Sequence, residues 1–144
     1  MKQEKKVFRI IVLEDSEFFN NMLTKQIDYF TSILAMEKNC RFEIQSCVST
    51  TDFLRNLKHE TDIAFVDYYL ENGITGADMI EKIKEQCWDC KVVVISQEKN
   101  IRNTVMSSID EGVDFVFKDL QSLPKCCFIL EDIFNGRFSS HQLN

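Results

Sequence analysis

Proline, glycine and long apolar runs are scarce in this chain. One proline and four glycines among 144 residues leave little material for a flexible linker, so a second domain is not expected. No apolar run approaches the roughly 20 residues that span a bilayer, and the charged start, residues 1–6, does not resemble a secretory signal. We therefore expect one cytoplasmic domain over residues 1–144, with a core at about 7–136, a short charged N-terminus and a frayed C-terminal tail.

A basic excess is missing as well, because 23 acidic residues face 17 basic ones and the formal net charge is −6. A nucleic-acid backbone is then a poor direct partner, because its binding depends on clustered basic side chains that replace the counterions of the phosphates. The 44% hydrophobic and 28% charged residues are ordinary for a globular domain. A chain of this length buries a full hydrophobic core without disulfides, and in the cytosol its six cysteines would stay reduced.

Short apolar runs alternate with helical patterns along the whole chain. The runs predict strands at residues 7–13, 41–48, 63–66, 91–95 and 114–117. Helices are expected at 16–38, from Ser49 or Thr50, around 79–83, at 100–111, and from Pro124 to about 135 with Gly136 closing the last one. Five strands each followed by a helix predict an α/β fold: a doubly wound, five-stranded parallel sheet with helices on both faces.

The first helical segment has a clear amphipathic pattern. Ser16 is suited to cap its N-terminus, and Phe18 falls outside the apolar stripe, so we expect its ring to face outward. The stripe that should face the core recurs at three- and four-residue spacing and consists of Phe19, Met22, Leu23, Ile27, Phe30 and Leu34.

Chemically active side chains follow four of the five predicted strands. Open α/β sheets bind ligands beyond the carboxyl ends of their strands. Reading those ends gives Glu14 and Asp15 after the first strand, Asp67 after the third, Ser96 after the fourth and Lys118 after the fifth. We expect these side chains to meet in one crevice.

Three converging carboxylates repel one another, and a hard divalent cation resolves the repulsion. Mg²⁺ characteristically takes one or two carboxylates, waters and a phosphate oxygen. Asp67 on the central strand is then placed as a nucleophile toward a phosphoryl group. Lys118 and the hydroxyl of Ser96 would balance the charge of its oxygens.

With these motifs the sequence resembles the response-regulator receiver domain, of the stand-alone, single-domain type. The resemblance covers residues 7–136 and rests on the acidic pair Glu14-Asp15, on Asp67 in IAFVD, on Ser96 in VVVIS and on Lys118 in FVFKD. It implies a flavodoxin-like strand order, 2-1-3-4-5.

The resemblance also implies a role for each site residue. Asp67 would be the phosphoacceptor, Ser96 and Lys118 phosphate contacts, and Ser96 with Phe115 the conformational switch. Mg²⁺ would be held by Glu14, Asp15, Asp67 and the backbone carbonyl of Tyr69. The implied function is a phosphorylation-dependent switch in a two-component phosphorelay, with slow self-hydrolysis of the aspartyl phosphate and no conventional enzyme activity.

The implied partners are a histidine kinase or a histidine phosphotransfer domain. The signal would leave through a downstream protein or a second copy, bound at the face of the fourth helix, strand five and the last helix. Neither direct nucleic-acid binding nor membrane insertion is implied.

Two residues depart from the family pattern and keep an alternative open. Asp119 stands where the family usually has proline, and Gln97 where it usually has a small side chain. Both favour a pseudo-receiver, an interaction module that is never phosphorylated. A flavodoxin-like cofactor binder would need a phosphate-cradling loop after strand one, where Glu14 and Asp15 stand instead. A haloacid-dehalogenase-like phosphatase would need an aspartate at Tyr69.

The pair Cys87 and Cys90 has the spacing of a redox or zinc motif. It falls at the C-terminal end of a predicted helix, whereas a redox pair needs a helix N-terminus to depress a thiol pKa. A zinc site needs four ligands, and no second pair with this spacing exists. We therefore interpret these residues, and the neighbouring Cys126 and Cys127, as reduced structural thiols.

Overall fold

The computed structural model describes residues 6–98 and 112–142, with side chains as far as residue 138. Its sheet has five parallel strands in the order β2-β1-β3-β4-β5. They are β1 (Lys6–Leu13), β2 (Cys40–Cys47), β3 (Ile63–Asp67), β4 (Lys91–Ser96) and β5 (Val113–Phe117). The predicted fold and strand order are confirmed, and every strand boundary lies within a single residue of its prediction.

Four helices and a short 3₁₀ turn are described. They are α1 (Glu17–Glu37), α2 (Thr50–Asn56), η1 (Glu71–Gly73), α3 (Gly76–Gln86) and α5 (Ser122–Gln142). The helix predicted at 100–111 lies outside the described residues. No helix in the described ranges combines the length and the apolar character needed to cross a membrane.

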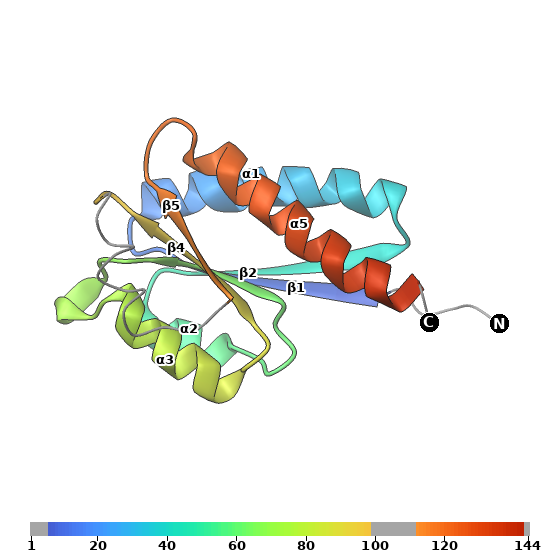
Figure 1. Cartoon of the computed structure of the whole chain (residues 1–144). Coiled ribbons are helices and arrows are strands. Elements are labelled where there is room, and N and C mark those ends of the chain that lie inside the picture. The colour runs from blue at the N-terminus through green and yellow to red at the C-terminus, as the bar shows by residue number, and fades with distance from the viewer. Residues whose placement is uncertain (1–5, 99–111, 143–144) are drawn as a thin grey trace.

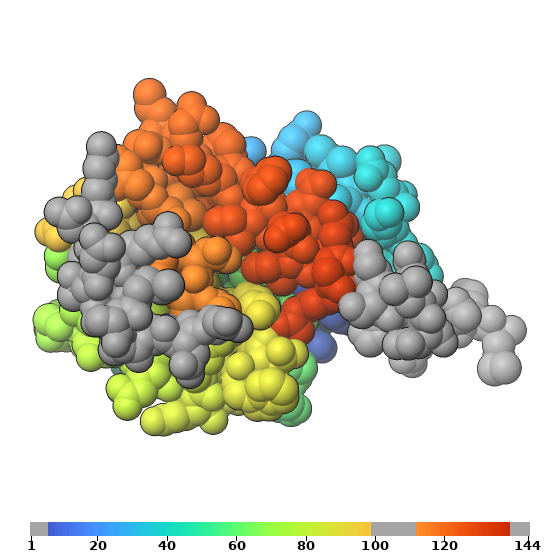
Figure 2. Space-filling view, in the orientation of Figure 1, coloured from blue at the N-terminus to red at the C-terminus, as the bar shows by residue number. Residues whose placement is uncertain are grey.

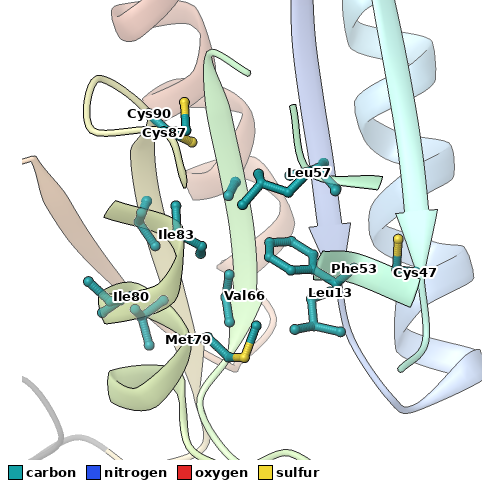
Figure 3. Close-up of a cluster of buried hydrophobic side chains, with 14 of the residues drawn as sticks. Leu13, Cys47, Phe53, Leu57, Val66, Met79, Ile80, Ile83, Cys87 and Cys90 are labelled. Carbon is teal, nitrogen blue, oxygen red and sulfur yellow. The ribbon is translucent and has the colours of Figure 1, made fainter. Parts of the chain in front are cut away.

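The helices cover both faces of the sheet, and each face has its own hydrophobic core. Figure 1 shows α1 and α5 on one face and α2 and α3 on the other. Successive residues of β3 alternate between the cores, because side chains of a strand point to opposite faces. Phe65 belongs to the core under α1 and α5. Ala64 and Val66 belong to the core under α2 and α3, part of which Figure 3 shows. Burial on both faces explains the continuous apolar runs.

The buried face of α1 differs in part from the predicted stripe. Met22, predicted to be buried, is 40% exposed, so this prediction is wrong. The buried positions fall at residues 20, 23, 27, 31 and 34, and Met22 is turned by about 100° from Leu23. Two of the buried residues are polar: Asn20, and Thr31, whose hydroxyl donates to the carbonyl of Ile27 at 2.8 Å. Phe18 faces outward as predicted and is 76% exposed.

The last helix is longer at both ends than its sequence indicated. It begins at Ser122, and Pro124 lies in the first turn, where a backbone N–H has no intrahelical acceptor. The prediction that Gly136 ends the helix is wrong, because α5 continues to residue 142. Glycine inside a helix costs about 1 kcal/mol relative to alanine, and packing offsets this here. The rings of Phe134 and Phe138, on either side of Gly136, stack with centroids 4.5 Å apart.

Candidate active site at the carboxyl edge of the sheet

The structure brings the predicted carboxylates together at one edge of the sheet. Glu14 and Asp15 follow β1 directly, and Asp67 is the last residue of β3, the neighbouring strand. One carboxylate oxygen from each of the three lies within 4.8 Å of the others. Glu14 and Asp67 are buried, while Asp15 is exposed. Three negative side chains therefore share a small, half-closed space.

Lys118 enters this cluster from the end of β5. Its Nζ lies 2.5 Å from Oε1 of Glu14 and 3.7 Å from Oδ1 of Asp67. The ammonium also lies over the ring of Phe19, 4.3 Å from the centroid, which is a cation–π contact. The lysine is thus held on three sides, and in this arrangement its primary partner is Glu14. The Lys118–Asp119 peptide bond is trans.

The crowding of charge changes how two of the carboxyl groups titrate. Burial, followed by the negative charge of Glu14, raises the pKa of Asp67 to about 7, and Lys118 only partly opposes this effect. The pKa of Asp15 is also raised, first by burial and then by a hydrogen bond with Glu14. One ammonium therefore does not neutralise the cluster, and an added cation would favour the ionised carboxylates.

Ser96 is buried at the end of β4, the strand next to β3. Its Oγ accepts a hydrogen bond from the backbone N–H of Glu98 at 3.0 Å, so the hydroxyl caps the turn that follows the strand. The neighbouring Gln97 is exposed. Ser96 thus lies at the same edge as the carboxylates, while its role as a phosphate contact stays a prediction.

Known structures share this architecture, although no protein-family model and no curated protein matches the sequence. A two component transcriptional regulator AraC from Clostridium phytofermentans has a TM-score of 0.71 and 14% identity, covering 95% of this chain and 99% of that one. A response regulator receiver domain protein from Clostridium thermocellum has a TM-score of 0.65 and 17% identity, covering 90% and 96%. The response regulator TrrA from Thermotoga maritima, solved with Mg²⁺ and BeF, has a TM-score of 0.65 and 17% identity, covering 88% and 98%. The fold is that of a response-regulator receiver domain.

The loop after β3 of this receiver fold is shaped by a glycine. A Cβ on Gly76 would lie 3.2 Å from Cα of Tyr68 and 3.5 Å from the carbonyl oxygen of Asp67. The N–H of Gly76 also donates to the carbonyl of Tyr68 at 2.6 Å. A side chain at this position would therefore press on the backbone of Tyr68, which would have to shift by a few tenths of an ångström. Gly76 therefore allows the close approach of the start of α3 to the chain just beyond Asp67.

Tyr69 lies in that loop with its side chain half exposed. Its ring meets the ring of Tyr68 edge-on at 4.9 Å. A hydrogen bond with the carboxylate of Glu98 raises the pKa of the Tyr69 hydroxyl. The loops after β3 and β4 are thus joined beside the cluster, and the role of the Tyr69 carbonyl as a metal ligand stays a prediction.

Asn20 is a site residue that the sequence did not reveal. It is buried on α1, and its amide donates to the carbonyl of Glu14 at 3.1 Å and to the carbonyl of Cys47 at 3.0 Å. Its Oδ1 accepts from the hydroxyls of Thr24 and Ser46. Asn20 therefore anchors the backbone of the acidic pair to α1 and β2. The signal that the sequence offered was helical spacing: Asn20 lies three residues before the buried Leu23 and therefore on the same face of α1.

Phe115, the predicted switch residue, is half buried in β5 and packs against the core under α2 and α3. The neighbouring segment, residues 99–111, lies outside the described residues. The movement of Phe115 on activation therefore stays a prediction.

Proposed function

We propose that this chain is a two-component receiver domain that accepts a phosphoryl group on Asp67. The observation that carries the proposal is the setting of Asp67: buried at the end of β3, within 4.8 Å of two further carboxylates and 3.7 Å from Lys118. This cluster holds three carboxylates and one ammonium.

In the proposed reaction an Oδ atom of Asp67 attacks the phosphorus of a phosphohistidine on a histidine kinase or phosphotransfer domain. An oxygen–phosphorus bond forms as the nitrogen–phosphorus bond breaks, and the histidine leaves. Lys118 moves its ammonium from Glu14 toward the phosphoryl oxygens, and the Ser96 hydroxyl donates to another of them. Attack by water on the aspartyl phosphate later restores Asp67.

The donor set at this site fits Mg²⁺. Carboxylate oxygens are the hard ligands that Mg²⁺ prefers, and the three that lie within 4.8 Å of one another supply the one or two that it characteristically takes. Glu14, Asp15 and Asp67, with the carbonyl of Tyr69, would hold the ion. When bound, it supplies the positive charge that lets a phosphoryl group approach a site that is otherwise anionic.

Phosphorylation would be read out as a change in shape. The new charge on Asp67 draws Ser96 toward it, and Phe115 turns inward into the space that the loop after β4 vacates. The face that includes β5 and α5 then gains a downstream protein or a second copy of the chain. No nucleic acid takes part directly, and we place the protein in the cytoplasm.

Intact mass after incubation with Mg²⁺ and acetyl phosphate tests the proposal. The wild-type chain should gain the mass of one phosphoryl group, and Asp67→Asn should gain none. Asp119→Asn is the matched control, because Asp119 is an exposed acid next to Lys118 in sequence, and its Oδ1 accepts from the backbone N–H of Gln121. Phosphorylation that persists in Asp67→Asn would contradict the assignment. An unmodified wild-type chain would instead favour the pseudo-receiver.

A further inference from the structure

Residues 87–90, Cys-Trp-Asp-Cys, form a tight turn between α3 and β4. The N–H of Cys90 donates to the carbonyl of Cys87 at 3.1 Å, which is the bond that closes a β-turn. The first and fourth Cα atoms of a β-turn lie less than about 7 Å apart, and a disulfide usually joins Cα atoms about 4.4–6.8 Å apart. The backbone therefore holds the two cysteines within reach of a disulfide bond.

The side chains of the two cysteines also meet. Both belong to the core under α2 and α3, where Figure 3 shows their sulfur atoms. Sγ of Cys90 donates to the carbonyl of Lys91 at 3.5 Å, and a hydrogen bond between the two thiols is the leading cause of the shift in both pKa values. The bond from Cys90 lowers the pKa of Cys87 to about 7, against the effect of burial, and the same bond raises the pKa of Cys90. Cys87 is thus the sulfur that ionises first. In its protonated form it donates to the carbonyls of His59 and Thr61, at 2.9 and 3.3 Å.

The other four cysteines lie in different settings. Cys126 and Cys127 are consecutive on α5, so their side chains point about 100° apart. Burial raises their pKa values, to about 12 and about 11. Burial likewise raises the pKa of Cys40, and that of Cys47 to about 11. These four thiols are therefore internal controls for any reaction at Cys87 and Cys90.

We propose that Cys87 and Cys90 are a redox-modification site, which a small peroxide converts to an intramolecular disulfide. The Cys87 thiolate attacks one oxygen of hydrogen peroxide; the O–O bond breaks, hydroxide leaves and takes up a proton, and Cys87 becomes a sulfenic acid. The Cys90 sulfur then attacks the Cys87 sulfur, the S–S bond forms, the S–O bond breaks, and the Cys90 proton leaves with the hydroxyl as water. The two sulfurs lose two electrons in total, and the peroxide gains them.

The position of the turn determines which oxidants reach it. The thiols are almost fully buried, but Trp88 is 81% exposed and the Asp89 side chain is 61% exposed. Because the two thiols are buried, a small oxidant such as hydrogen peroxide can reach them more readily than a bulky disulfide can. Oxidation removes the Cys87 proton and with it both bonds to the segment that precedes β3. The guanidinium of Arg137 donates hydrogen bonds to the carboxylate and the backbone carbonyl of Asp89 in the same turn. Figure 2 shows this end of α5, in red, against the yellow segment before β4.

Peptide mapping tests the proposal directly, because trypsin releases both cysteines in one peptide, residues 85–91. The folded protein is treated with hydrogen peroxide, denatured, alkylated and digested. We expect this peptide to lose two hydrogens and carry no alkyl group, while Cys40, Cys47, Cys126 and Cys127 stay alkylated. Dithiothreitol should restore alkylation. A peptide 85–91 that is alkylated at both cysteines to the same degree as Cys126 and Cys127 would overturn the proposal.

Two variants separate the steps of the reaction. In Cys90→Ser, peroxide should leave a sulfenic acid on Cys87 that dimedone traps, with no internal disulfide. Cys127→Ser is the matched control and should form the disulfide as the wild type does. Circular dichroism checks folding first, and Cys90→Ala replaces the serine variant if that variant does not fold. Pairing of Cys87 with any cysteine other than Cys90 in the wild-type protein would contradict the proposal.

Discussion

The two edges of the sheet both carry buried charge, yet they balance it differently. At the amino edge, the guanidinium of Arg137 lies 3.2 Å from Oδ1 of Asp62 and 3.2 Å from Oδ2 of Asp89. Asp62 also accepts from the backbone N–H of Arg9 at 2.8 Å, and the Arg9 side chain pairs with Glu43 at 3.1 Å. Each of these carboxylates thus has a cationic partner, as expected of ion pairs that hold a fold together.

At the carboxyl edge, Lys118 is the cation that the described residues place among Glu14, Asp15 and Asp67. The excess negative charge is carried by a buried group whose pKa rises to about 7. The comparison teaches that unbalanced charge, rather than buried charge as such, distinguishes the candidate site. Burial raises the pKa of Asp62 as well, although Arg137 and Arg9 oppose this effect, so the excess of negative charge, and not a raised pKa alone, separates the two edges.

The largest stability effect is expected at the balanced edge. Arg137→Ala removes the partner of Asp62 and should lower the free energy of unfolding by about 3 kcal/mol, because a largely buried carboxylate loses its cation. Urea denaturation measures the change. Arg55→Ala is the matched control, since the Arg55–Asp52 pair is exposed and should contribute at most about 1 kcal/mol. Equal losses in the two variants would show that the amino edge is not held by its ion pairs.

At the unbalanced edge, removing a charge should stabilise the fold. Asp67→Asn should raise the free energy of unfolding at pH 8 by roughly 2 kcal/mol in the absence of divalent cations, because it removes repulsion from a buried site.

The pH dependence gives the sign of this effect. In the folded state the pKa of Asp67 is raised from 3.8 to about 7. The protonated carboxyl group therefore adds its full contribution to the free energy of unfolding below pH 3.8, and this contribution is lost as the pH rises to about 7. The stability of the wild type should therefore fall over this window, and that of Asp67→Asn should fall less. Thermal unfolding between pH 4 and 8 measures both curves, and parallel curves would contradict the raised pKa.

Added Mg²⁺ should reduce the difference between the two edges. A ligand at ten times its dissociation constant stabilises the folded state by about 1.4 kcal/mol, so Mg²⁺ should raise the melting temperature of the wild type at pH 8. Asp15→Asn should shift the midpoint of the Mg²⁺ titration to higher concentration. Glu17→Gln is a suitable control, because this exposed acid follows the pair without belonging to the cluster. A response that is equal in all three proteins would exclude specific binding at the cluster.

The smallest stability effect is expected at the surface beside the unbalanced edge. Phe18 is 76% exposed at the start of α1, and Phe18→Ala should change the free energy of unfolding by less than about 0.5 kcal/mol. It should slow phosphotransfer from a protein donor and leave phosphorylation by acetyl phosphate unchanged. Met36→Ala, at the other end of α1 and 88% exposed, should affect neither reaction. Equal losses with both donors would show that Phe18 acts through the fold.

The sequence by itself determined the strands, their parallel arrangement and the residues at their carboxyl ends. Apolar runs and helical periodicity are local signals of burial, so they locate strands such as β3 and β4 within a single residue. Such signals do not report where burial ends along a helix that is held by distant contacts. Gly136 was therefore misplaced as a terminus, and Met22 was misplaced as a core residue.

Tertiary structure alone decided how the charges pair. Lys118 is 104 residues from Glu14 in sequence, and packing makes Glu14, not Asp67, its closest partner at 2.5 Å. Packing likewise aims the amide of Asn20 at the carbonyls of Glu14 and Cys47. The physical reason is that a side-chain hydrogen bond depends on angstrom-scale distances between separate elements. A sequence pattern specifies which residues reach one edge of a sheet, and the packed structure specifies which atoms meet there.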